Sequence, residues 1–137
     1  VKQTLDLARK ADVALVGIGD MSENSYMVDL GWFTPGEVVQ SRLLQGVVGD
    51  FAGYDFFDVH GKAANTVMSD RVIGLALEEF RPIAEVIAIA AENSKPLALL
   101  GALRTGVVDV IATSVSNALT VLNLDEQMKH VELIDKN

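Results

Sequence analysis

The chain has 137 residues, 50% of them hydrophobic, and carries eleven Lys and Arg against nineteen Asp and Glu. This length fits one domain that can bury a core without disulfides or a structural metal. The formal net charge of -8 has the wrong sign for a surface that follows the phosphates of DNA. The absence of cysteine excludes a disulfide framework and a Cys-based metal site, and it fits a reducing compartment, of which the cytoplasm is the default.

The first ten residues contain neither an initiator Met nor a signal peptide, and the spacing of Leu5, Leu7 and Ala8 is already helical. We therefore expect the chain to be a fragment of a longer polypeptide whose preceding part carries some of the activity. Charged residues interrupt the most apolar region, 85–104. No stretch therefore approaches the ~20 apolar residues that a membrane-spanning helix needs.

The N-terminal quarter predicts a helix, a strand and a long loop. Gln3–Ala11 has helical spacing and leads into Val13–Ile18, whose unbroken apolar character predicts a strand covered on both faces. Gly17 and Gly19 then predict a tight turn or a close approach of the backbone. Residues 20–36 are rich in Ser, Asn, Asp and Gly, which predicts a long loop. Loops of this length in compact domains commonly carry function.

A capped helix is predicted after this loop. Thr34 as the N-cap, Pro35 at the first helical position and Glu37 as the capping-box partner predict a helix over Glu37–Leu44. Gly46 is expected to end this helix.

The rest of the chain predicts an alternation of strands and helices. Residues 47–58 are rich in β-branched and aromatic residues broken by glycine, which predicts a bent strand or hairpin before a turn at 60–62. An α/β fold with a mostly parallel sheet and flanking helices follows from the alternation. The predicted strands are Arg71–Leu75, Val86–Ala91 and Val107–Ala112, the predicted helices are Leu77–Pro82, Pro96–Leu103 and Ser116–Leu122, and a charged tail with helical character occupies 125–137.

Three apolar runs, 12–22, 85–95 and 107–116, each end in a cluster of small polar residues. If these runs are parallel strands, their carboxyl ends share one edge of the sheet, which is where open α/β sheets bind small ligands. At the first of these ends, segment 17–20 can present backbone N–H groups and the Asp20 carboxylate to a ligand above the sheet. A glycine-rich exit that contacts no ligand is an equally open interpretation, and the third glycine of a dinucleotide fingerprint is missing.

Asp50 and Lys95 are the charged candidates for ligand binding. Asp50 lies in an otherwise apolar segment, where its carboxylate either binds paired hydroxyls of a polyol or bonds the N–H groups of a bulge. Lys95 stands directly before the helix that Pro96 begins, so its ammonium either holds a phosphate with the first helical turn or remains solvated. In the loop, Trp32 and Phe33 either close over a ligand or anchor the loop.

Several other polar residues have structural explanations. Ser114 or Ser116 can cap the last helix, and Thr113 lies at the same strand exit. Arg104 is expected near a helix carboxyl terminus, with a subunit contact as the alternative. Asp58 favours turn chemistry.

No catalytic residue is proposed. His60 and His130 have no recognisable ligand spacing, so no metal site is proposed. No Ser lies in a nucleophile elbow, and no cofactor is expected.

The segments DVALVGIGD, GVVGDFAGYDFFDVHG, RVIGLALEEF, IAEVIAIAAENSKPLALLGALRTGVVDVIATS and NALTVL, taken in order, resemble the effector-binding domain of SorC-type sugar-responsive transcriptional regulators. The resemblance covers Ala11 to Leu122 and is closest to the sorbose and sorbitol operon regulators. It implies effector contacts from Gly17, Gly19, Asp20, Asp50 and Lys95.

The resemblance also implies a fold similar to the phosphosugar isomerases and glucosamine-phosphate deaminases, which here binds a sugar or sugar phosphate without converting it. A homo-oligomer, either dimer or tetramer, and a DNA-reading helix-turn-helix in the parent protein are implied too. Residues 1–137 would then be a single effector-binding domain lacking its N-terminal part, since the family's first strand precedes Val1. The family usually has a glycine pair where Ala91 and Glu92 stand, and the Glu92 charge keeps a neutral polyol or sugar open as the effector.

Three functions remain open from the sequence. The leading hypothesis is a sensing domain whose effector changes the DNA affinity of the parent protein. The second is a phosphosugar isomerase or deaminase, with Asp50 as base and Lys95 holding the phosphate. The third is an oligomerisation platform, which a mean hydropathy of +0.29 permits.

Overall fold

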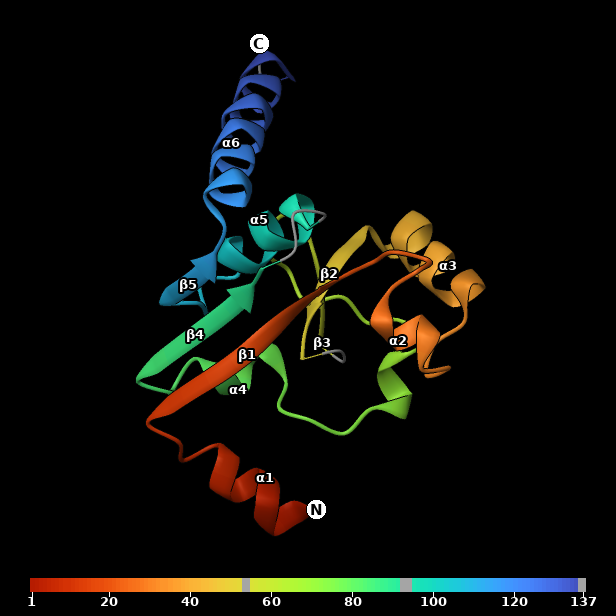
Figure 1. The fold of residues 1–137 in the computed structure, drawn as a ribbon, viewed down its shortest axis with the longest axis vertical. Helices are drawn as coiled ribbons and strands as arrows, with labels where there is room; N and C mark the ends of the chain where they lie inside the picture. Colours follow the sequence, from red (N-terminus) through yellow and green to blue (C-terminus); the bar gives the residue numbers. More distant parts are fainter. Residues whose placement is uncertain (53–54, 92–94, 136–137) are drawn as a thin grey trace.

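The structure, a computed structural model, describes residues 1–52, 55–91 and 95–135 (Figure 1). One five-stranded sheet has the strand order β3-β2-β1-β4-β5. The pairs β1–β4 and β4–β5 are parallel, whereas β1–β2 and β2–β3 are antiparallel. The strands are β1 Val13–Asp20, β2 Val47–Phe51, β3 Asp55–Asp58, β4 Glu85–Ala90 and β5 Val110–Thr113.

The α/β class is thus confirmed, but the sheet is mixed rather than mostly parallel. The predicted hairpin at 47–58 supplies the antiparallel half, because β2 and β3 pair with each other and β2 also pairs with β1. The helix before β2 lies beyond the carboxyl end of β1 in Figure 1. The chain therefore re-enters the sheet at that end and runs back along β1.

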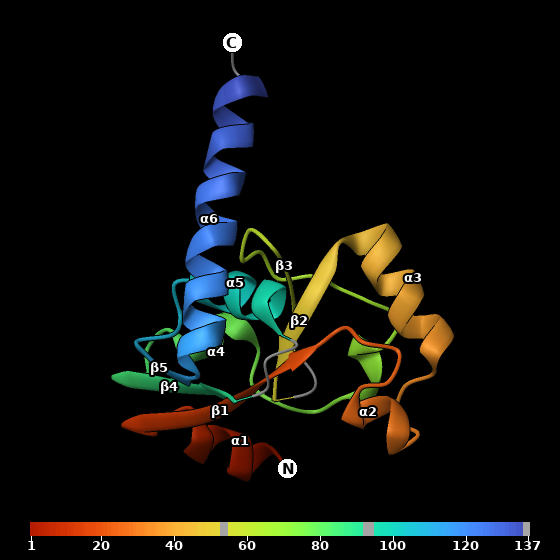
Figure 2. The ribbon, with the colours of Figure 1, turned by 45° about the horizontal axis from the view of Figure 1, so that its top comes forward.

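Helices flank the sheet, and the longest of them extends away from it. The helix predicted at 116–122 and the charged tail form one continuous helix, which leaves the body of the molecule in both views (Figures 1 and 2). The helices are α1 Lys2–Ala8, α2 Tyr26–Asp29, α3 Pro35–Gln45, the 3-10 turn η1 Ser69–Arg71, α4 Leu77–Phe80, α5 Pro96–Arg104 and α6 Val115–Asp135.

The capping prediction for α3 is confirmed in detail. The Thr34 hydroxyl accepts the Glu37 N–H at 3.2 Å, and the Glu37 carboxylate accepts the Thr34 N–H at 2.9 Å. Gly46 ends the helix with φ 66°, a left-handed conformation that glycine adopts without steric cost.

Two local predictions are wrong, and a third is right in one of its two alternatives. Gly17 and Gly19 do not form a tight turn, because β1 continues through them to Asp20 and keeps pairing with β2. The alternative of a close approach is confirmed at Gly19, where an added Cβ would lie 2.8 Å from Cγ of Asp50. Residues 71–75 form no strand, since η1 and irregular backbone occupy this region. The first helix ends at Ala8, three residues earlier than predicted, and a turn follows it.

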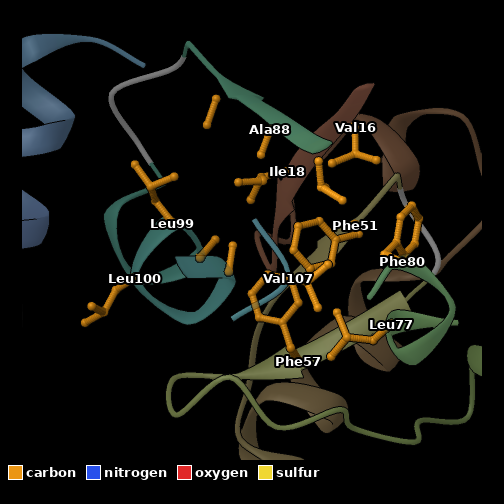
Figure 3. Close-up of a cluster of buried hydrophobic side chains, with 14 of the residues drawn as sticks. Val16, Ile18, Phe51, Phe57, Leu77, Phe80, Ala88, Leu99, Leu100 and Val107 are labelled. Carbon is orange, nitrogen blue, oxygen red and sulfur yellow. The ribbon is translucent and has the colours of Figure 1, made fainter. Parts of the chain in front are cut away.

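The main core lies between one face of the sheet and α5. Ile18 of β1, Ala88 of β4, Phe51 of β2 and Leu99 of α5 are each at most 3% exposed and point into it (Figure 3). Burying a side chain such as Leu99 or Phe51 stabilises the fold by about 1.5–3 kcal/mol relative to leaving it exposed. A second, smaller apolar cluster includes Phe33 and Phe56, and it fixes α3 and the loop before it.

The opposite face of the parallel strands, which we call the open face, is not covered. Val13, Leu15, Ile89 and Val110 point to this side and are 52%, 67%, 43% and 41% exposed. The prediction that the first strand is buried on both faces is therefore wrong for these 137 residues. No helix in the part of the chain that the structure describes could span a membrane.

Candidate functional site

A cavity of about 430 Å³ lies at the carboxyl end of β1, and we call it the strand-end pocket. Four separate parts of the chain contribute to it: β1, the loop with α2, the end of β2, and the residue before α5. Its lining residues are Gly17, Ile18, Gly19, Asp20, Ser25, Tyr26, Met27, Trp32, Asp50, Ala52 and Lys95. All five effector-contact candidates from the sequence therefore border one cavity.

Asp50 is held next to Gly19 by the pairing of β1 with β2. The two residues are register partners in the antiparallel ladder, and Asp50 is only 3% exposed. A Cβ added to Gly19 would lie 2.8 Å from Cγ of Asp50 and closer still to Oδ2. The missing side chain of Gly19 thus provides the space that the Asp50 carboxyl group occupies.

Lys95 lies half-buried at the start of α5 and reaches back to β1. Its ammonium donates a hydrogen bond to the backbone oxygen of Ile18 at 3.2 Å. This bond holds the ammonium against β1 at the border of the strand-end pocket, so Lys95 is not the freely solvated lysine of the alternative interpretation. Glu92, whose charge was expected near the same place, lies outside the described residues.

Gly17 and Asp20 complete the candidate set. Asp20 is the last residue of β1, where it pairs with Gly49 and remains partly exposed. A Cβ added to Gly17 would meet nothing within 4 Å, so close packing does not require glycine there. The pocket therefore combines two carboxyl groups, one ammonium and backbone polar groups, which is a set suited to hydroxyl recognition.

Sequence reasoning did not single out Ser25, Tyr26 and Ala52 as pocket residues. Ser25 and Tyr26 belong to the start of α2, a helix of four residues inside the predicted loop. Tyr26 is 73% exposed, and the signal available in the sequence was an aromatic residue among polar loop residues. Ala52 gave no signal, because its role depends on the backbone conformation at the end of β2.

The two aromatic residues of the loop have different positions. Trp32 is 58% exposed and borders the strand-end pocket, whereas Phe33 is 5% exposed. The Phe33 ring packs against that of Phe56, with 5.8 Å between the centroids. Phe33 therefore anchors the loop, and Trp32 remains available to a ligand.

The other polar candidates serve the fold. Ser114 accepts the Asn117 N–H at 3.1 Å and so caps α6, while Thr113 donates to the backbone oxygen of Ala90. Asp58 accepts two N–H groups of the turn that follows β3. Arg104 pairs with Asp125 of α6 at 2.8 Å, so it joins two helices of the same chain.

One carboxyl group with a raised pKa lies outside the strand-end pocket. Burial raises the pKa of Asp55 to about 6, against a lowering effect of a hydrogen bond from the Leu77 backbone. Asp55 borders a different cavity and not the strand-end pocket. Over the described ranges, no three His, Asp or Glu side chains gather in a way that could hold a metal ion.

The fold and the pocket define the class: an α/β domain with a cavity of small-molecule size at its strand ends. The family model described as "Putative sugar-binding domain" matches residues 1–123. The chain belongs to this family, and the resemblance to SorC-type regulators is confirmed.

Solved and curated relatives agree with this assignment. A domain of a transcriptional repressor from Vibrio fischeri is 59% identical with a TM-score of 0.82, covering 91% of this chain and 49% of that one. The full-length sorbitol operon regulator SorC from Klebsiella pneumoniae is 25% identical with a TM-score of 0.72, covering 87% and 38%. The transcriptional regulator LsrR of Escherichia coli is 31% identical over 124 residues, which is 89% of this chain and 39% of LsrR.

These relatives are transcriptional regulators rather than enzymes. The chain spans less than half of the length of each of them.

Proposed function

We propose that this domain senses a sugar or sugar phosphate in the strand-end pocket and does not convert it. The observation that carries the proposal is the convergence of Asp50 and Lys95 beside the glycine at position 19. A buried carboxyl group accepts hydrogen bonds from paired hydroxyls, and an ammonium donates to ring or hydroxyl oxygens. In the parent protein, binding would favour one arrangement of the regulator and so change its affinity for DNA.

The experiment is a thermal-unfolding screen of this chain against hexoses, pentoses, hexitols and their monophosphates. We expect at least one compound to raise the unfolding temperature, because a ligand that binds only the folded state stabilises it. Asp50→Asn keeps the shape of the side chain but removes its charge, and we expect it to abolish the shift. The matched control is Asp58→Asn, which changes a carboxylate of the neighbouring strand outside the pocket.

Two outcomes would contradict the proposal. One is the absence of a shift with every compound, and the other is an equal shift in Asp50→Asn and the parent. Mass spectrometry of the bound compound after prolonged incubation distinguishes the enzyme alternative, which predicts an isomerised or deaminated product. An unchanged compound with a retained thermal shift is the result expected of a sensor.

We further propose that the 137 residues form one part of a larger effector-binding domain. The open face exposes apolar side chains of parallel strands, and such strands are normally covered on both sides. A cavity on this face is bordered by Leu15, Ile89 and Lys95, so it adjoins the strand-end pocket. Polypeptide covering the open face would therefore also close the pocket on that side. We also propose that the parent protein forms a homo-oligomer.

A further inference from the structure

The last helix, α6, has apolar side chains on two opposite faces. On its inner face Val121 is buried, and Leu124 and Met128 pack against the main core. A second row of residues, which we call the outer stripe, recurs at intervals of three and four. Because an α-helix has 3.6 residues per turn, this row lies on the side of α6 that faces away from the body. The outer stripe consists of Val115, Leu119, Leu122, Glu126, Lys129 and Leu133.

The outer stripe is open to solvent. Leu119, Leu122 and Leu133 are 58%, 62% and 60% exposed. In both views the C-terminal part of α6 extends beyond the other labelled elements (Figures 1 and 2). Repeated exposed leucines on one side of a protruding helix are typical of a surface that packs against another helix.

The charges of the outer stripe select a second copy of this chain as the other helix. The alternating spacing of four and three residues is that of the a and d positions of a coiled coil. Glu126 and Lys129 occupy two of these positions and carry opposite charges. In a parallel pair of copies, each of them would face its own counterpart, so like charges would meet.

An antiparallel pair removes this conflict. When the pair is centred midway between Glu126 and Lys129, Glu126 of each copy faces Lys129 of the other. The same alignment places Leu122 of each copy opposite Leu133 of the other, because both leucines lie equally far from the centre. An antiparallel arrangement also keeps the two bodies at opposite ends of the pair. Charges and leucines are therefore complementary in one register.

The charges beside this seam are compensated. In the same register Asp125 comes near Glu132 of the second copy. The Asp125 carboxylate already pairs with Arg104 at 2.8 Å and with Lys129 at 2.6 Å. Lys129 then lies between two carboxylates, that of Asp125 in its own helix and that of Glu126 in the second copy.

We propose that two copies of this chain associate through the outer stripes of α6 in antiparallel orientation, with Glu126 of each copy against Lys129 of the other. Two leucine pairs enclose two charge pairs, which is a short contact, so we expect a dissociation constant on the order of ten micromolar. The inference is independent of sugar binding, since the outer stripe shares no residue with the strand-end pocket.

The first test is sedimentation equilibrium of this chain at concentrations around that value, where we expect a mixture of monomer and dimer. Lys129→Glu places carboxylates opposite each other in both charge pairs and should weaken dimerisation about tenfold or more. Adding Glu126→Lys to this variant restores opposite charges and should restore the dimer. The control is Asp135→Lys, which changes a charge on the opposite side of α6 and should alter dimerisation less than about twofold.

A second test maps the register without changing a charge. The chain has no cysteine, so each introduced cysteine reports one contact. A mixture of Leu122→Cys and Leu133→Cys should form a disulfide-linked dimer under mild oxidation, whereas neither variant should do so alone. In the proposed register the two copies of position 122 lie about 16 Å apart along the helix axis, at ~1.5 Å per residue, which is too far for a disulfide.

Three results would overturn the inference. The first is a monomer at every concentration, and the second is a dimer that Lys129→Glu leaves intact or that the double variant does not restore. The third is rapid cross-linking of Leu122→Cys with itself, which would indicate parallel pairing. A thermal shift with a sugar in a chain that stays monomeric would support the proposed function while removing α6 as an interface, so the two claims fail separately.

Discussion

Single residues of the pocket could be selected from the sequence, but their pairing could not. Asp50 was a candidate because a carboxylate interrupts an apolar segment, and Gly19 because it ends an apolar run. Nothing in the local pattern indicated that the two are register partners across β1 and β2. That fact also changes the role of Gly19, which leaves space for a carboxyl group and does not form a turn.

Two glycines of the same strand provide a test at this scale. In Gly19→Ala, the new methyl group would overlap the Asp50 carboxyl group, so we expect a loss of about 1–3 kcal/mol in the free energy of unfolding. Sugar binding should be lost in the same variant. Gly17→Ala places its methyl group in open space, and its stability should stay within about 0.5 kcal/mol of the parent. Urea denaturation of both variants measures the difference, and equal stabilities would contradict this account of Gly19.

At the scale of elements, prediction was accurate where a helix or strand carries its own local signals. The limits of α3 followed from Thr34, Pro35, Glu37 and Gly46, because a capping box and a left-handed stop need only neighbouring residues. The segment 71–75 has the composition of a strand but forms none. A strand forms only where it pairs with another strand, and no strand of the sheet pairs with this segment.

The contact between β3 and α4 gives a pH-dependent prediction. Burial raises the pKa of Asp55 from its usual 3.8 to about 6, and the nearby Glu79 and Glu78 act in the same direction. The folded chain therefore binds a proton at Asp55 more tightly than the unfolded chain does. The resulting stabilisation is fully present below the unfolded pKa and is lost as the pH rises through about 6.

We expect Asp55→Asn, which stays neutral, to become more stable relative to the parent as the pH rises from about 4 to about 7. Urea midpoints of the two proteins at a series of pH values measure this difference. Oδ2 of Asp55 is buried without a hydrogen-bond partner, which fits a carboxyl group that resists ionisation. If the difference in stability between Asp55→Asn and the parent were the same at every pH, the raised pKa of Asp55 would be contradicted. Asp58→Asn serves as the control on the same strand.

At the scale of the whole molecule, the parallel strands of the sheet are covered on one side only. α5 and the main core lie on that side, while Leu15 and Ile89 point out of the open face. The unbroken apolar character of β1 indicated burial on both faces, and the structure of these 137 residues supplies only one covering layer. The proposal that further polypeptide covers the open face explains this difference.

The lack of cysteine in the chain makes this proposal testable by thiol labelling. We expect Leu15→Cys to react rapidly with a thiol reagent in this chain, where Leu15 is 67% exposed, and much more slowly in the intact parent regulator. Leu43→Cys on α3, at a position 73% exposed, should react rapidly in both. Equally fast labelling of Leu15→Cys in both proteins would contradict the proposal. Slow labelling in this chain together with a dimer in sedimentation would identify a second copy as the cover instead.

The sequence by itself determined the α/β class, the capped helix, the hairpin and the charged and glycine residues at the strand ends. These features depend on periodicity, capping and turn chemistry, which act over a few neighbouring residues. Only the tertiary structure decided that the sheet is mixed and that Asp50 lies across from Gly19. Those relations join residues far apart along the chain, and they depend on strand order and register, which are set by the packing of the whole molecule.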